Sequence, residues 1–315
     1  MKSKLIAPLL GLLVGLLVPA AGAAAPPDDL GRPDRLVRAA DVEIVKKQTL
    51  PAAPFLAQTA RAPKTAKSRT AATGILGDHS SGNKYAIVVG VSDYPGTAND
   101  LAYGHIDAGE MAQALKTVYG YTDVNVSLFR DSEAKRSDIL AAINRAVAKA
   151  RTGDEIVFFF SGHGAKGRAD DGDKEAMDES IVVWDGSGLG YIWDGELKAA
   201  FNGCAASRMV FIFDSCLSGG MTDVKGPRRV ISMASTETGY SYEGPAWNNG
   251  EFTHYYVDLG RLGSDAAADI YDHDGDGVLG EAADVAEEEA WDYAKSHCTV
   301  DTPTISDSFV NDLRL

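Results

Sequence analysis

One unbroken apolar run, residues 209–213 (MVFIF), constrains the fold of this chain more than any other feature. Such a run is typical of a strand that is buried on both faces of a parallel sheet. Asp214, Ser215 and Cys216 follow it directly, and the turn-forming residues 218–220 come next. The Cys216 thiol is therefore predicted at the carboxyl end of a central strand, where open α/β sheets place their ligands.

A second run, residues 155–160 (EIVFFF), repeats this layout and leads into Ser161-Gly162-His163-Gly164. The glycines on either side of His163 let the backbone approach a substrate closely and adopt unusual dihedral angles. A single cysteine after a strand is more often a small buried apolar residue, and a single histidine in a glycine loop is more often a turn residue. Two core strands that end in His and Cys within about 60 residues favour a Cys–His nucleophilic hydrolase instead.

The elements before these two strands predict the fold class. They are a strand at 85–91, a helix at 106–119, a strand at 124–129, a helix within 131–150 and the strand at 155–160. This alternation is the signature of an α/β fold with a mainly parallel sheet and helices on both faces.

Composition narrows the class of partner. The chain has 315 residues, of which 45% are hydrophobic, and this suits one globular domain with tails. The net charge of −15 argues against nucleic acid as a partner and against anionic membranes. An acidic surface suits cationic substrates or calcium.

Residues 1–25 are interpreted as a secretory signal peptide. Two lysines begin it, the apolar run 5–18 is too short to span a bilayer comfortably, and 21–23 or 23–25 offers a small-residue cleavage site. We therefore expect a secreted, periplasmic or cell-surface protein without a stable membrane anchor. An uncleaved anchor is the alternative.

Residues 26–80 are rich in Pro, Ala, Thr and Ser and lack periodicity. This composition predicts a mostly disordered pro-segment or linker, followed by a domain at 81–315. The basic residues exposed there to a protease of basic preference are Arg61, Lys64, Lys67 and Arg69. A simple solvated spacer is the alternative.

The three cysteines allow one disulfide. In an exported protein an odd count leaves one free thiol, which we assign to Cys216. Cys204 and Cys298 are then predicted to form a disulfide, with two buried thiols as the alternative.

Residues 272–279 (DHDGDGVL) match the first eight positions of an EF-hand-type calcium loop. Asp272, Asp274 and Asp276 stand at positions 1, 3 and 5, and Val278 stands at position 7, which ligates through its carbonyl. Position 12 is Ala283, so another acid must close the shell. The candidates are Glu281, Asp284, Glu288 and Glu289. The sequence predicts Ca²⁺ at 272–283, with a solvated acidic turn as the alternative.

Several of these stretches resemble the caspase–metacaspase superfamily of cysteine peptidases, over about residues 84–312. The carriers are YAIVVGVSDYPG, HIDAGEM, VFFFSGHG, MDESIVVWDG, IFDSCLSGG and ASTETGYSYE. The calcium-type loop, with EEAWDYA and TPTISD after it, resembles the exported bacterial branch. The resemblance implies a three-layer α/β sandwich, in which helices flank a mostly parallel sheet of about six strands.

The resemblance also implies an activity: peptide-bond hydrolysis through an acyl-enzyme. Cys216 would be the nucleophile and His163 the proton-transfer partner, while the backbone N–H groups of Cys216 and Gly164 would stabilise the oxyanion. Asp107 and Asp214 stand where this family places the two acids that bind a P1 Arg or Lys. Their alternatives are a helix N-terminal acid for Asp107 and a turn residue for Asp214.

A second calcium site is implied by Asp178, Asp194 and Asp223, although Gly195 stands where the family has a further acid. The sequence thus predicts a secreted cysteine endopeptidase that cleaves proteins or peptides after Arg or Lys, with calcium dependence and a zymogen form. The alternative is a non-catalytic, calcium-stabilised binding module on a caspase-like scaffold. An esterase is disfavoured because no G-x-S-x-G motif occurs.

Overall fold

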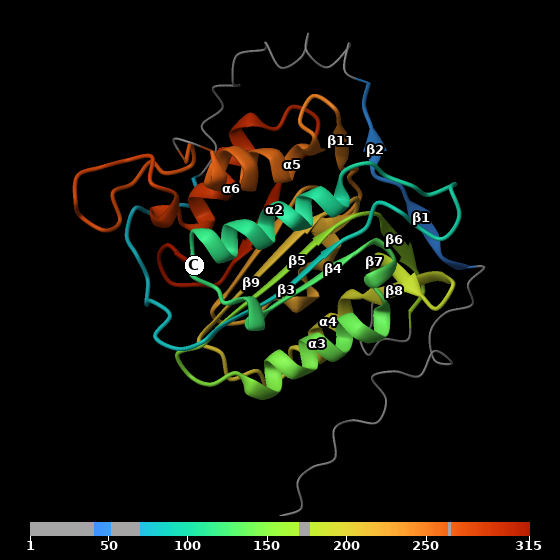
Figure 1. The fold of residues 1–315 in the computed structure, drawn as a ribbon, viewed down its shortest axis with the longest axis horizontal. Helices are drawn as coiled ribbons and strands as arrows, with labels where there is room; N and C mark the ends of the chain where they lie inside the picture. Colours follow the sequence, from blue (N-terminus) through green and yellow to red (C-terminus); the bar gives the residue numbers. More distant parts are fainter. Residues whose placement is uncertain (1–40, 52–69, 170–176, 264–265) are drawn as a thin grey trace, which may run out of the picture.

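The structure is a computed structural model, which describes residues 41–51, 70–169, 177–263 and 266–315. Its centre is a six-stranded sheet with the order β13-β10-β9-β5-β3-β4 (Figure 1). Every neighbouring pair is parallel except β10 and β13. The strands are β3 (Lys84–Gly90), β4 (Val126–Arg130), β5 (Glu155–Ser161), β9 (Arg208–Asp214), β10 (Arg229–Met233) and β13 (Thr304–Asp307). The predicted mainly parallel α/β fold is confirmed.

Helices cover both faces of this sheet, as Figure 1 shows. One face carries α2 (Gly104–Thr117), α5 (Glu251–Thr253), the π-helix η6 (His254–Leu262) and α6 (Glu287–His297). The other carries α3 (Arg136–Lys149) and α4 (Asp194–Ala200). Among the described residues, 3₁₀ turns include η3 (Asp123–Asn125), η4 (Asp131–Glu133), η5 (Ser218–Val224) and η7 (Ala282–Asp284).

The two central strands hold the core together because both of their faces are covered. Every residue of β5 and β9 is buried. Phe158 and Phe160 point to the α3 and α4 side, whereas Phe159 points to the α2 and α6 side. Each fully buried Phe contributes about 1.5–3 kcal/mol relative to an exposed one. The unbroken apolar runs in the sequence reflect this two-sided burial.

Two small sheets flank the carboxyl edge of the central one. The first has the order β1-β6-β7-β8, formed by β1 (Glu43–Val45), β6 (Gly164–Gly167), β7 (Asp178–Asp185) and β8 (Gly188–Trp193). The second has the order β12-β11-β2, formed by β12 (Asn249–Gly250), β11 (Tyr242–Gly244) and β2 (Gln48–Thr49). Both sheets thus take an edge strand from the residues just after position 40.

The predicted disorder of residues 26–80 is wrong for the described parts of that stretch. Residues 43–49 add β1 and β2 to the two small sheets. Residues 71–76 are held by the carboxylates of Asp292 and Asp312, which accept hydrogen bonds from four backbone N–H groups, and by a bridge between Leu76 and Asp312. Such short pairings need no hydrophobic periodicity, so composition alone does not reveal them.

The predicted signal peptide at 1–25 and the basic residues at 61–69 lie outside the described residues. Within the described ranges, no helix is both long enough and apolar enough to cross a membrane.

The predicted disulfide between Cys204 and Cys298 is also wrong, since both residues are free thiols. Cys204 packs against the core on the α3 and α4 side, and Cys298 packs against the core on the α2 and α6 side. The central sheet therefore separates two thiols that would have to approach to about 5.5–6 Å between Cα atoms.

Candidate active site

The strand order brings His163 and Cys216 to the same edge of the sheet. β5 and β9 are adjacent and parallel, and Ser161 pairs with Asp214 at their carboxyl ends. His163 and Cys216 each follow that pair by two residues. A Cβ on Gly164 would lie 2.1 Å from the carbonyl oxygen of Cys216, so only glycine permits this close approach of the two backbones. The two residues predicted as oxyanion donors are therefore in direct backbone contact.

The His163 ring is held in one orientation. Its Nε2 lies 2.8 Å from the carbonyl oxygen of Asn99, and its Nδ1 lies 3.0 Å from the backbone nitrogen of Lys47. The Tyr94 ring stacks on it at 4.8 Å, and the Tyr94 hydroxyl accepts a hydrogen bond from the His163 N–H. Because the Lys47 N–H can only donate, Nδ1 must be the acceptor and Nε2 carries the proton. Burial lowers the pKa of His163 to about 4, so the ring is neutral at pH 7.

The Cys216 thiol is equally enclosed. Its Sγ accepts a hydrogen bond from the Ser241 N–H at 3.2 Å, and the side chain packs against Val45 and Leu217. Burial raises the pKa of Cys216 to about 12. The predicted nucleophile and its predicted base are thus both neutral in this state, and the residues that enclose them include residues 45 and 47 of the N-terminal stretch.

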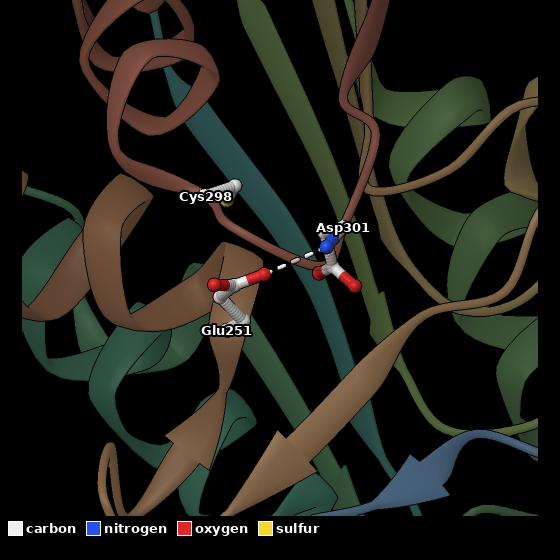
Figure 2. A group of neighbouring side chains, drawn as sticks. All are labelled: Glu251, Cys298 and Asp301. Carbon is white, nitrogen blue, oxygen red and sulfur yellow. Dashed lines mark hydrogen bonds between the residues drawn. The ribbon is translucent and has the colours of Figure 1, made fainter. Parts of the chain in front are cut away.

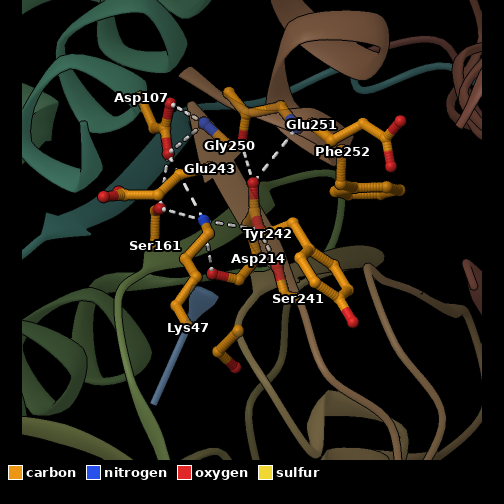
Figure 3. A network of polar contacts seen from close by, with 12 residues as sticks. Lys47, Asp107, Ser161, Asp214, Ser241, Tyr242, Glu243, Gly250, Glu251 and Phe252 are labelled. Atoms are coloured by element: carbon orange, nitrogen blue, oxygen red, sulfur yellow. Dashed lines mark hydrogen bonds and ion pairs between the residues drawn. The ribbon is translucent and has the colours of Figure 1, made fainter. Parts of the chain in front are cut away.

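The predicted pocket acids do lie together, and a lysine occupies the space between them (Figure 3). The Lys47 Nζ is 2.7 Å from Asp214 Oδ1 and 3.7 Å from Asp107 Oδ2. It also donates to Ser161 Oγ at 3.2 Å and to the backbone oxygen of Asp214 at 3.3 Å. The side chains of Lys47, Asp107 and Asp214 are completely buried. A Cβ on Gly250 would lie 2.5 Å from the Lys47 Nζ, so a glycine is needed there for the ammonium to fit.

Both pocket carboxylates are oriented by other donors. Asp214 accepts from Thr253 N, Thr253 Oγ1 and Ser241 Oγ. Asp107 accepts from Ser161 Oγ and from the Gly250 N–H. Burial raises the pKa of Asp107 to about 6, although the Lys47 charge opposes that shift. Burial lowers the pKa of Lys47, but the nearby carboxylates more than offset this and raise it above its usual value. The pocket is therefore built to hold one buried cation.

Sequence reasoning gave no role to Lys47, Asn99 or Glu243. Glu243 is a third buried acid beside the pocket; it accepts from the N–H groups of Ala102 and Tyr103 and from Thr49 Oγ1. The Asn99 contact is made by a backbone carbonyl, which no residue type signals. Lys47 lies in a stretch whose composition predicts disorder.

A buried acidic cluster lies behind the pocket, formed by Glu251, Asp301 and Cys298 (Figure 2). Glu251 accepts hydrogen bonds from the backbone N–H groups of residues 299–301. Asp301 accepts from the N–H groups of Tyr242 and Phe252. Because backbone donors use these carboxylates, the cluster ties the chain at 299–301 to the wall of the pocket and does not have the character of a metal site.

The predicted calcium loop has its carboxylates close together. Oxygens of Asp272, Asp274 and Asp276 lie within 4.8 Å of one another, and all three residues are exposed. Asp272 accepts from the N–H groups of Gly275 and Gly277, which fold the loop around its acids. This donor set of hard oxygens fits Ca²⁺.

Three of the four candidates for closing the calcium shell are buried, and Glu281 is not. Asp284 accepts from the His273 N–H and pairs with Arg314, while Glu288 and Glu289 are buried and accept from backbone N–H groups. Glu281 is half-buried, and Asp276 is the main cause of its raised pKa. Glu281 is therefore the acid best placed to face the loop.

The three acids of the second predicted calcium site do not form such a group among the described residues. Asp178 begins β7 and Asp194 begins α4. Asp223, in η5, forms an ion pair with Lys198 at 2.8 Å.

Comparisons with known proteins agree with this geometry. Residues 84–225 match the family model described as the metacaspase, peptidase C14 domain. Metacaspase-1 of Schizosaccharomyces pombe is 32% identical over 155 residues, and Metacaspase-4 of Arabidopsis thaliana is 32% identical over 151 residues. These matches cover 45% and 44% of this chain and 36% and 34% of those relatives, so the likeness spans about a third of each relative's length.

A solved structure supports the fold. The crystal structure of a protein from Geobacter sulfurreducens superposes with a TM-score of 0.52 at 18% identity. The superposition covers 71% of this chain and 93% of that one.

Proposed function

We propose that this protein is a metacaspase-like cysteine peptidase that cleaves peptide bonds after Lys or Arg, since residues 84–225 match the model of the metacaspase, peptidase C14 domain. The observation that carries the proposal is the Lys47 ammonium, seated between Asp214 and Asp107 at the sheet edge that holds His163 and Cys216. A buried cation is tolerated only where carboxylates pair with it, and an acidic P1 side chain would be repelled there.

The chemistry follows from the two side chains at the sheet edge. Cys216 Sγ gives its proton to His163 Nδ1 and attacks the scissile carbonyl, and the imidazolium then protonates the leaving amine. The Asn99 carbonyl holds the ring so that Nδ1 faces the reaction. The N–H groups of Gly164 and Cys216 stabilise the oxyanion, and one such donor contributes about 3 kcal/mol in other enzymes. Water hydrolyses the resulting thioester.

We propose that the chain is made as a zymogen. The stretch around β1 and β2 fills the acidic pocket formed by Asp107 and Asp214 and buries the His163–Cys216 dyad, which leaves a neutral thiol and a neutral imidazole. Access to a peptide substrate requires that this stretch leave the site. Its departure re-exposes Cys216 to water and removes the main cause of its raised pKa.

Calcium and export belong to the same proposal. The donor set at 272–278 would hold Ca²⁺ through Asp272, Asp274, Asp276 and the Val278 carbonyl, with Glu281 closing the shell. Bound calcium would offset the repulsion among these exposed acids and so order the loop that precedes α6. The charged start and apolar run of residues 1–25 support export to a compartment where calcium is abundant.

The test is hydrolysis of matched fluorogenic peptides that end in Lys, Arg or Asp, with calcium or with chelator, by the Lys47→Ala chain and by the same chain carrying Cys216→Ala. We expect cleavage after Lys and Arg that requires Cys216. Cleavage after Asp alone would refute the proposed pocket for a basic P1 side chain. A folded Lys47→Ala chain that cleaves none of the peptides would favour a non-catalytic binding module.

A further inference from the structure

The chain direction of residues 43–50, here called segment 43–50, is informative because this segment crosses the candidate active site. β1 pairs antiparallel with β6, and Val45 lies opposite Gly164. β2 pairs parallel with β11, with Gln48 opposite Tyr242 and Thr49 opposite Glu243. Figure 1 shows both strands at the edge of the molecule, beside β6 and β11. The backbone is thus fixed on both sides of Lys47, and its direction is defined.

A peptide that is cleaved must satisfy two conditions at once. The side chain of the residue that donates the scissile carbonyl enters the pocket. The nitrogen of the next residue is the leaving group, so it must lie beside His163 Nδ1, from which it takes its proton.

Neither peptide bond near the pocket meets both conditions. For the bond after Lys47, the side chain is in the pocket, but the leaving nitrogen of Gln48 donates to the carbonyl oxygen of Ser241 at 2.9 Å. For the bond before Lys47, the Lys47 nitrogen lies 3.0 Å from His163 Nδ1, but the Lys46 side chain extends to the carbonyl oxygen of Ala98, outside the pocket. In both cases, one requirement is met and the other fails.

Reversal of the chain direction would satisfy both. If a lysine keeps its side chain in the pocket while the backbone runs in the opposite direction, the amide groups on its N-terminal and C-terminal sides exchange positions. The following nitrogen then faces His163, and the preceding residues pair antiparallel with β11.

We propose that segment 43–50 is an inverted pseudosubstrate: it inhibits the site through Lys47 yet is not cleaved there in cis, whereas cleaved peptides bind antiparallel to β11. This inference rests on the proposed peptidase function. It implies that the maturation cut lies elsewhere in the chain, because neither peptide bond next to Lys47 is placed for cleavage by His163 and Cys216.

The first test uses the wild-type full chain and intact mass spectrometry, with calcium, at two protein concentrations. Cleavage in cis proceeds at a rate that does not depend on the protein concentration. We expect no such cleavage of the 46–47 or the 47–48 peptide bond. A cut at either bond at such a rate, absent in Cys216→Ala, would overturn the proposal.

The second test compares Lys47→Ala with Lys46→Ala, its neighbour in the same segment, in the full chain. Loss of the buried ion pair should weaken the segment, and we expect hydrolysis of a Lys peptide to rise about 100-fold in Lys47→Ala. The Lys46→Ala chain should behave as the wild type does. Equal effects of the two changes would refute inhibition through Lys47.

The third test determines the direction of a bound peptide relative to β11. The Lys47→Ala chain is reacted with a peptidyl chloromethyl ketone that ends in Lys, and its crystal structure is determined. An antiparallel peptide on β11 is expected, and a parallel one would overturn the proposal. If every variant fails to hydrolyse any Lys or Arg peptide, the proposed function is refuted; if hydrolysis occurs together with a cis cut at Lys47, only the inverted orientation is refuted.

Discussion

The two pocket acids should contribute unequally to the recognition of a P1 lysine, because their distances from the ammonium differ. The Lys47 Nζ lies 2.7 Å from Asp214 and 3.7 Å from Asp107. With an effective dielectric constant of about 20, Coulomb's law gives gross attractions of about 6 and about 4.5 kcal/mol. Removal of one partner of a buried pair costs about 3–5 kcal/mol in measured cases. A substrate lysine that takes the place of Lys47 should meet the same geometry.

We therefore expect Asp214→Asn to lower kcat/KM for a P1 Lys peptide by a factor on the order of 10³. The effect of Asp107→Asn should be about tenfold smaller, which corresponds to the difference between the two Coulomb energies. Both changes leave the dyad in place, so the loss should fall on substrates that carry a cation at P1.

The assay is kcat/KM in the Lys47→Ala background, with matched peptides that carry Lys or the neutral norleucine at P1. The ratio of the two values isolates the charge, because damage to the fold or the dyad lowers both. Asp123→Asn is the matched control, since its exposed carboxylate pairs with Lys116 at the surface. Equal losses for the Lys and norleucine peptides would refute the reasoning, and so would a larger effect of Asp107→Asn.

Three further outcomes are expected. Iodoacetamide should label Cys216 slowly in the wild-type chain and faster in Lys47→Ala, as read by peptide mass, since burial raises the pKa of this thiol to about 12; equal rates would contradict the proposed shielding. The pKa of His163 is lowered to about 4, so between pH 4 and its ordinary pKa of 6.5 only the unfolded chain takes up this proton. The free energy of unfolding therefore falls as the pH falls through this range. In urea unfolding, this loss should be about 3 kcal/mol larger in the wild type than in His163→Asn. Calorimetric titration should show calcium binding that Asp272→Asn abolishes and that Asp223→Asn retains; binding that survives Asp272→Asn would exclude the loop.

The elements of the central sheet could be predicted because each carries its own pattern. Residues 155–160 and 209–213 are apolar without interruption, and this follows from burial on both faces of β5 and β9. The glycines around His163 and the turn after Cys216 then place both side chains at one edge. Asp107 could be assigned to the pocket only through the family resemblance, since an acid in the first turn of a helix is common for other reasons.

The predicted disulfide failed for a physical reason. The number of cysteines limits how many disulfides can form, but it does not determine on which face of the sheet each cysteine lies. Cys204 and Cys298 lie in core clusters on opposite faces. Only the packing of the helices decides this.

The sequence by itself determined the α/β sheet, the place of His163 and Cys216 at its carboxyl edge and the calcium-type loop, because these features depend on local periodicity and on fixed short spacings. The tertiary structure alone decided what occupies the pocket. β1 and β2 have three and two residues, too few for any pattern, and their pairing with β6 and β11 spans more than a hundred residues of chain. The position of Lys47 between Asp214 and Asp107, and the direction in which its backbone runs, follow from those distant pairings.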